Sequence, residues 1–178
     1  MVYGGKELAA AFRTVRKNTI QVAEDIPEEQ YYHVAAPDCK AVGQMFVHVV
    51  VAADMRQEFH GRRKLNTFVG LDFLPFLEQS RAEENKPRSK AEIVELLRTQ
   101  GEEFAGWMES LTPEFLSEMV TQGDGKTTTS RLEFLLSVKE HEMHHRAQLM
   151  LIERQLGIVP HLTRQSEERM AQMRAAKA

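Results

Sequence analysis

Apolar residues recur every three or four positions along most of the chain, the period of an amphipathic helix. The first such segment runs from about Gly5 to Glu24, and Pro27 enforces an end soon after it. A second segment runs from Asp38, a residue suited to cap a helix, to about His60, just before Gly61. No segment shows a convincing run of the alternation that a strand requires. We therefore expect an all-α protein.

Two sequences of the form Ser-x-x-Glu mark the starts of two further helices. Ser89-Lys90-Ala91-Glu92 opens a segment that reaches about Ser110, and Ser130-Arg131-Leu132-Glu133 opens one that Gly157 and Pro160 stop. The long connection at 62–88 is expected to hold a shorter helix at 71–81. Four segments of roughly 20 residues, each about 30 Å long, have the dimensions of a four-helix bundle. We predict this bundle at 1–160 and a peripheral helical tail at 161–178.

The overall composition is that of an ordinary globular chain, with 178 residues of which 42% are hydrophobic and 28% charged. The formal net charge of -3 and the scattered Lys and Arg residues give no reason to expect a nucleic acid or an anionic membrane as partner. No signal-peptide pattern is seen, and the longest apolar stretch, 45–53, is too short to cross a bilayer. The lone Cys39 cannot form an internal disulfide, so we expect a cytoplasmic protein.

The histidine pattern is the strongest chemical signal. His141 and His145 are four residues apart in the last long helix, a spacing that stacks two side chains about 5–6 Å apart on one face. His48 lies on the apolar stripe of the second helix. A single histidine on such a stripe is more often a hydrogen-bonded core residue, but burying a pair of imidazoles needs several partners, and one ion could replace some of them. We therefore predict a site in which His48, His141 and His145 bind one divalent metal ion, zinc or nickel.

The remaining polar residues near this pattern are given more ordinary roles. His144 lies about 60° round the helix from His141 and about 100° from His145, so we expect it to be exposed. We expect solvated roles for the histidines in or beside loops, which are His33, His60 and His161. Gln148, one turn beyond His145, either orients a ligand or is a polar residue at the end of the bundle.

Taken together, these residues resemble the DinB/YfiT-like family. The resemblance rests on His-Glu-Met-His-His-Arg-Ala-Gln at 141–148, on His48 in a helix after Pro37-Asp38, and on Ser130-Arg131. It implies an up-down-down-up four-helix bundle, commonly a homodimer, with a divalent metal ion on the three histidines. Relatives with known activity include bacillithiol-dependent and related S-transferases and a mycothiol-dependent maleylpyruvate isomerase, so it also implies a small-molecule substrate and a low-molecular-weight thiol cosubstrate.

Three functions compete at this point. We favour a metal-dependent transferase in which a thiol loses its proton at the ion and attacks an electrophile in the bundle mouth. A second possibility is a non-catalytic metal-binding or stress-related scaffold. The third is a zinc protease, because His141-Glu142-x-x-His145 satisfies H-E-x-x-H, with Glu142 as general base and Glu167 or Glu168 completing the metal site. Such proteases normally present a strand edge to their substrate, and no strand is predicted here.

Overall fold

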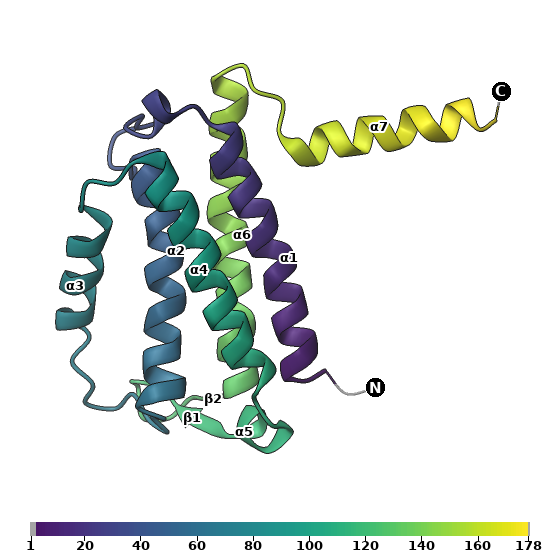
Figure 1. The fold of residues 1–178 in the computed structure, drawn as a ribbon. Coiled ribbons are helices and arrows are strands. Elements are labelled where there is room, and N and C mark those ends of the chain that lie inside the picture. Colours follow the sequence, from purple (N-terminus) through teal and green to yellow (C-terminus); the bar gives the residue numbers. More distant parts are fainter. Residues whose placement is uncertain (1–2, 178) are drawn as a thin grey trace.

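The chain forms a four-helix bundle, which a computed structural model describes for residues 3–177 (Figure 1). Its long helices are α1 (Gly5–Asp25), α2 (Val42–Gln57), α4 (Lys90–Glu109) and α6 (Arg131–Gln155). Helices α1 and α6 run in one direction and α2 and α4 in the other, so the order along the chain is up-down-down-up, as predicted. Both α1 and α2 pack against α4 and α6.

The connections carry the smaller elements. A 3₁₀ turn (Glu28–Gln30) follows α1, and a π-helical turn (Glu58–Arg62) continues α2. Helix α3 (Leu74–Glu84) packs against α2 and returns the chain to the end of the bundle where α4 begins (Figure 1). Between α4 and α6 lie α5 (Pro113–Ser117) and the strands β1 (Met119–Thr121) and β2 (Thr128–Ser130), and α7 (His161–Ala175) follows α6.

The predicted all-α bundle is confirmed, and the structure adds one small hairpin that the sequence did not indicate. Strands β1 and β2 form an antiparallel hairpin with Met119 opposite Ser130. Each strand has only three residues, which is too short for a period-two pattern to be visible in the sequence. The hairpin lies at the end of the bundle, below α2 and α6 (Figure 1).

The helix starts show which capping signals were reliable. Ser89 caps α4, because its hydroxyl accepts from the Glu92 amide while the Glu92 carboxylate accepts from the Ser89 amide. Ser130 likewise accepts from the Glu133 amide at the start of α6. The prediction of Asp38 as a cap was wrong. Asp38 has a left-handed φ of 65°, and α2 begins only at Val42.

The end of α2 also differs from the prediction. Gly61 does not stop the helix; the backbone passes through it in the π-helical turn Glu58–Arg62. A Cβ at Gly61 would lie 2.9 Å from the Trp107 ring of α4. Glycine at this position therefore allows a close contact between α2 and α4, which is a packing role rather than a capping one.

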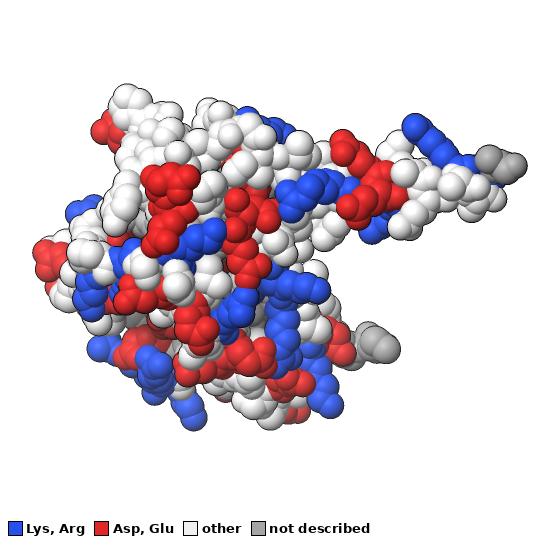
Figure 2. All heavy atoms as spheres, turned by 45° about the horizontal axis from the view of Figure 1, so that its top comes forward, with Lys and Arg blue, Asp and Glu red and all other residues white. Residues whose placement is uncertain are grey.

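The C-terminal helix stands away from the bundle (Figures 1 and 2). Its first turn is anchored, because His161 contacts Asn18 and Arg164 forms an ion pair with Asp25. From 165 to 177 every residue is exposed, including Met170 and Met173. The prediction of a peripheral C-terminal helix is confirmed. Among the described residues, no helix has the length and apolar character needed to cross a bilayer.

Candidate metal centre

The helical period of α6 brings His141 and His145 to the same side of the bundle. Their ring centroids are 4.6 Å apart, and the two Nε2 atoms face each other at 3.2 Å. The buried positions of α6, among them Val138, Leu149 and Ile152, hold this helix against α1 and α2. The two imidazoles therefore sit at the margin of the core, each partly buried.

Helix α2 supplies the third imidazole. His48 Nε2 lies 3.2 Å from His141 Nε2, and the His48 ring centroid is 4.8 Å from that of His145. One nitrogen from each of the three rings lies within 4.8 Å of the other two. The structure thus brings together the side chains that the sequence pattern singled out, although 93 positions separate His48 from His141.

The far side of two of these rings is fixed by an outer partner. Nδ1–H of His48 donates to Glu84 Oε1 at 2.7 Å, and Nδ1–H of His145 donates to Gln148 Oε1 at 2.8 Å. Each bond places the ring proton on Nδ1 and leaves the Nε2 lone pair directed at the cluster. Outer partners of this kind are typical of histidines that bind metals. Gln148 thus has an orienting geometry, one of the two roles considered from the sequence.

Sequence reasoning missed Glu84. This residue ends α3, its side chain is almost fully buried, and it forms a second ion pair with Lys40. Burial alone would raise the pKa of Glu84, but the hydrogen bonds from Lys40 and His48 outweigh it and lower the pKa. No hydrophobic periodicity marks Glu84, because α3 is a short helix within the long α2–α4 connection and has few buried apolar residues. The only hint in the sequence was an acidic residue just past the short helix predicted at 71–81.

Burial also shapes the protonation of the cluster. It lowers the pKa of His141 to about 4, with smaller contributions from the neighbouring His145 and His48. Burial likewise lowers the pKa of His145, against the opposing effect of its bond to Gln148. Both rings are therefore neutral at pH 7, the form in which imidazole binds a metal ion.

The arrangement fits a divalent metal ion. At a zinc–nitrogen distance of about 2.0–2.1 Å, two nitrogens on a tetrahedral ion lie about 3.3 Å apart. The observed Nε2 separations of 3.2 Å are close to this value. Without an ion, His141 Nε2 would face the lone pairs of His48 and His145 with at most one proton to share. The donor set of neutral imidazoles suits zinc, nickel, copper or iron.

Glu142 does not belong to this cluster. Its side chain is 1% exposed, and both oxygens accept from Arg16 of α1 at 2.9–3.1 Å. Arg16 also donates to the Leu97 carbonyl and to Gln100 on α4. Glu142 is thus held in the core by a buried ion pair, a position that does not suit the general base of a protease. Glu167 and Glu168 are exposed on the projecting part of α7.

The other histidines divide into correct and wrong predictions. His144 is exposed, as expected, and packs its ring against His145. His60 and His161 are buried, against the expectation of solvated roles. The π-helical turn directs His60 onto Phe134 and Phe68, where Arg131 contacts its Nδ1, and burial lowers its pKa to about 4. His161 is covered because α7 starts against α1.

Two solved structures from Bacillus subtilis have a similar fold. YfiT, described as a probable metal-dependent hydrolase with an unusual four-helix bundle topology, matches with a TM-score of 0.66 and 18% identity over 86% of this chain and 88% of its own. The DinB-like protein YjoA matches with a TM-score of 0.57 and 19% identity over 85% of this chain and 92% of its own. At these identities the likeness concerns the fold alone.

Comparison with curated proteins gives no match. The sequence model of the DinB family, in contrast, matches residues 1–175, which is nearly the whole chain. The up-down-down-up bundle agrees with this match. The chain belongs to the DinB family.

Proposed function

We propose that His48, His141 and His145 bind one divalent metal ion. The observation that carries this proposal is the convergence of three Nε2 atoms while Glu84 and Gln148 occupy the opposite nitrogens of two rings. With these outer partners in place, the Nε2 atoms of His48 and His145 still lack a partner other than His141 among the described residues. The third ring, His141, cannot donate to both of them at once. An ion in the middle satisfies all three rings.

Zinc or nickel is the ion that we expect. The donors are nitrogen atoms only, and the nearest carboxylate, Glu84, is engaged with His48 and Lys40 instead of facing the cluster. Magnesium, calcium and manganese prefer oxygen ligands, so this donor set does not favour them. Iron and copper remain chemically compatible with imidazole, which makes elemental analysis part of the test below.

We further propose that the protein is a metal-dependent enzyme acting on a small molecule, with a thiol as cosubstrate. Three protein ligands leave a coordination position open, whereas structural zinc sites are usually closed by four. A bound ion would supply Lewis acidity, which lowers the pKa of a thiol or a water at that position. The family resemblance favours a thiol, and the description of YfiT as a probable metal-dependent hydrolase makes water the alternative nucleophile.

The chain's own residues would set the geometry of this reaction. Glu84 holds His48 and Gln148 holds His145, so both rings keep one orientation while substrates exchange. His144 is exposed and packs its ring against that of His145 without belonging to the cluster. Glu142 and Arg16 hold α6 to α1 from inside the core, so Glu142 does not face the cluster.

The proposal is tested with metal-loaded protein, a low-molecular-weight thiol such as bacillithiol, and an electrophile such as monochlorobimane. We expect thiol conjugation that disappears in His48→Ala and persists in the matched variant His144→Ala, with both variants folded by circular dichroism. Ester cleavage that needs no thiol would favour the hydrolase instead. Stoichiometric metal binding without turnover on either type of substrate would leave the non-catalytic scaffold as the function.

We also propose that the chain is a homodimer and that its last helix is a dimerisation arm, separate from a bundle unit at 1–160. The exposed segment 165–177 has Glu167 and Glu168 near its start and Arg174 and Lys177 near its end, with Met170 and Met173 between them. Two such helices in antiparallel contact about a two-fold axis place acidic residues against basic ones. A lone helix of about this length is marginal in water, so a partner would stabilise it.

Nucleic acid remains outside the partners that we propose. Acidic and basic side chains alternate over the face drawn in Figure 2, without a broad basic area. The formal net charge is -3. We expect the protein to act in a reducing compartment such as the cytoplasm, because a metal-bound thiol and an exposed lone Cys39 both suit reducing conditions.

A further inference from the structure

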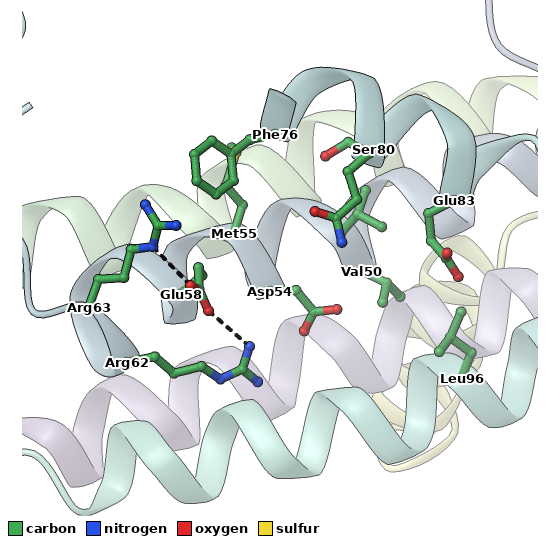
Figure 3. Close-up of a pocket in the computed structure, with 12 residues that line it drawn as sticks. Val50, Asp54, Met55, Glu58, Arg62, Arg63, Phe76, Ser80, Glu83 and Leu96 are labelled. Atoms are coloured by element: carbon green, nitrogen blue, oxygen red, sulfur yellow. Dashed lines mark hydrogen bonds and ion pairs between the residues drawn. The ribbon is translucent and has the colours of Figure 1, made fainter. Parts of the chain in front are cut away.

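A cavity of about 440 Å³ lies between α2, α3 and α4 (Figure 3). Its wall contains none of the three histidines and not Glu84. Pockets for small molecules usually measure about 300–1,000 Å³. The cavity therefore has room for a small ligand independent of the metal centre.

The charged groups of the cavity wall are paired, with one exception. Glu58 accepts from Arg62 and Arg63, the two ion pairs drawn in Figure 3. Glu83 pairs with Lys86 and Arg88 on its outer side. Asp54 has no Lys, Arg or His group within ion-pair distance among residues 3–177. It is the one carboxylate of this wall without a cation.

Asp54 is nevertheless held in a fixed orientation. Its Oδ1 accepts from Gln100 Nε2 at 2.9 Å, and Gln100 Oε1 in turn accepts from the buried Arg16 at 2.7 Å. Among the described residues no hydrogen bond reaches Oδ2. Burial raises the pKa of Asp54, while Arg62 and Arg16 oppose this rise only through space. Because Oδ2 has no partner among those residues and is not a buried atom, it is free to accept a hydrogen bond from a ligand in the recess.

Apolar side chains form one part of the recess, and Gln79 and Ser80 add polar groups to it. Val50, Met55 and Phe76 come from the two helices on either side, and Leu96 closes it from α4. Figure 3 shows the Asp54 carboxylate between these side chains and Arg62. Small-molecule sites usually combine apolar contact surface with a few directed polar groups, and this wall has both.

We propose that this cavity binds a small primary amine whose ammonium group pairs with Asp54 and whose apolar body contacts Phe76 and Met55. The ammonium group would donate to the free Oδ2 and replace the missing counter-charge. Arg62 and Arg63, neutralised by Glu58, do not compete for Asp54. The proposed amine site shares no lining residue with the metal centre.

The test is calorimetric titration of the full chain with 2-phenylethylamine as probe. We expect saturable binding of one amine per chain, weakened about tenfold or more in Asp54→Asn, because a hydrogen bond to a charged group is lost. The amide variant keeps the shape of the side chain and can still bond to Gln100. Glu78→Gln is the matched control, since it removes an exposed carboxylate of α3 that does not line the cavity. It should bind within about twofold of the native chain.

Two further arms separate charge recognition from simple apolar burial. The neutral analogue 2-phenylethanol should bind about tenfold more weakly than the amine, and His48→Ala should leave amine binding unchanged. Absence of saturable amine binding to the native chain would overturn the proposal. So would equal affinity in Asp54→Asn, equal affinity for the alcohol, or loss of binding in His48→Ala, which would place the amine at the histidines instead.

Discussion

Two histidines of the cluster have their orientation fixed by what their other nitrogen contacts. Glu84 is the outer partner of His48, and Gln148 that of His145. A carboxylate raises the basicity of an imidazole more than an amide does, so the bond from His48 should contribute more to metal affinity. The contribution of Glu84 to metal affinity can therefore be measured with all three histidines in place.

Glu84→Gln should lower metal affinity about 10–100-fold, because it removes the charge behind His48 while keeping a hydrogen-bond acceptor. Competition with a chromophoric chelator measures the affinity. Glu83→Gln is the control, since the adjacent Glu83 pairs with Lys86 and Arg88 instead of a histidine. Equal affinities in the two variants would show that Glu84 does not support the site.

Glu142 offers a second test with a single substitution. A partner of the buried Arg16 and the general base of an H-E-x-x-H site predict different results. Glu142→Gln leaves the buried Arg16 charge without its partner and should lower the free energy of unfolding by about 3–5 kcal/mol. Metal stoichiometry should be unchanged. Urea unfolding and elemental analysis give the two readouts. Arg13→Ala, which breaks exposed pairs with Glu102 and Glu109, should cost no more than about 1 kcal/mol.

A Glu142→Gln protein of native stability would contradict the structural role. The local geometry explains why the pair is sensitive: a Cβ at Gly101 of α4 would lie 2.8 Å from Arg16 Cγ, so α4 leaves room for this side chain only through a glycine. The sequence showed an H-E-x-x-H motif here, but motif spacing does not reveal which face of the helix the glutamate occupies relative to Arg16.

Among the elements, the long helices could be predicted and the irregular segments could not. Periodicity located α1, α4 and α6 to within a few residues, and Ser89 and Ser130 marked two starts through their capping bonds. Asp38 misled because the residue after a proline can turn the chain instead of capping it. The π-helical turn that buries His60 depends on contacts with Phe134, which no local pattern encodes.

A buried carboxyl group without a hydrogen-bond partner lies near the junction between α6 and α7. Glu153 is fully buried, and neither of its oxygens has a hydrogen-bond partner among the described residues. Burial, with a smaller effect of Asp25, raises its pKa from 4.5 to about 7, although Arg154 and Arg164 oppose this. A raised pKa in the folded state means that the stabilisation is complete below pH 4.5 and is lost as the pH rises through about 7.

Glu153→Gln should therefore gain stability relative to the native chain as the pH rises. Between pH 5 and pH 8 the difference in free energy of unfolding should shift by about 1–3 kcal/mol in favour of the variant. Chemical denaturation at several pH values measures this shift. The titration of Asp25 and His161 affects both proteins and so cancels in the difference. Glu140→Gln, an exposed change on the same helix, should show none. A difference that does not vary with pH would refute the raised pKa.

At the scale of the whole molecule, α7 is the feature that the isolated chain leaves unexplained. Glu167→Arg with Glu168→Arg should weaken self-association, and so should Arg174→Glu with Lys177→Glu, because each makes like charges meet in the antiparallel pair. Mixing the two double variants should restore a dimer. Sedimentation velocity at low ionic strength measures all three samples. A native chain that stays monomeric at every concentration, or variants that dimerise like it, would contradict the arm.

The candidate metal site could be anticipated from the sequence only in part. His141 and His145 share a helix face by spacing alone, and His48 was in phase on another helix. Glu84 could not be found in this way, because it approaches His48 from a connection whose path depends on how α3 packs against α2. Lys40, just before α2, pairs with Glu84 and could not be found by spacing either. Long-range packing, not local pattern, supplies the outer half of the site.

The most direct test of the account is the metal content of protein purified without a metal-affinity tag, dialysed against zinc or nickel and measured by elemental analysis. The account predicts one ion per chain in the native protein and in His144→Ala, and less than about a tenth of that in His48→Ala or His141→Ala, since loss of one ligand of three removes most of the binding free energy. Equal metal content in His48→Ala and the native chain would contradict a site shared by α2 and α6.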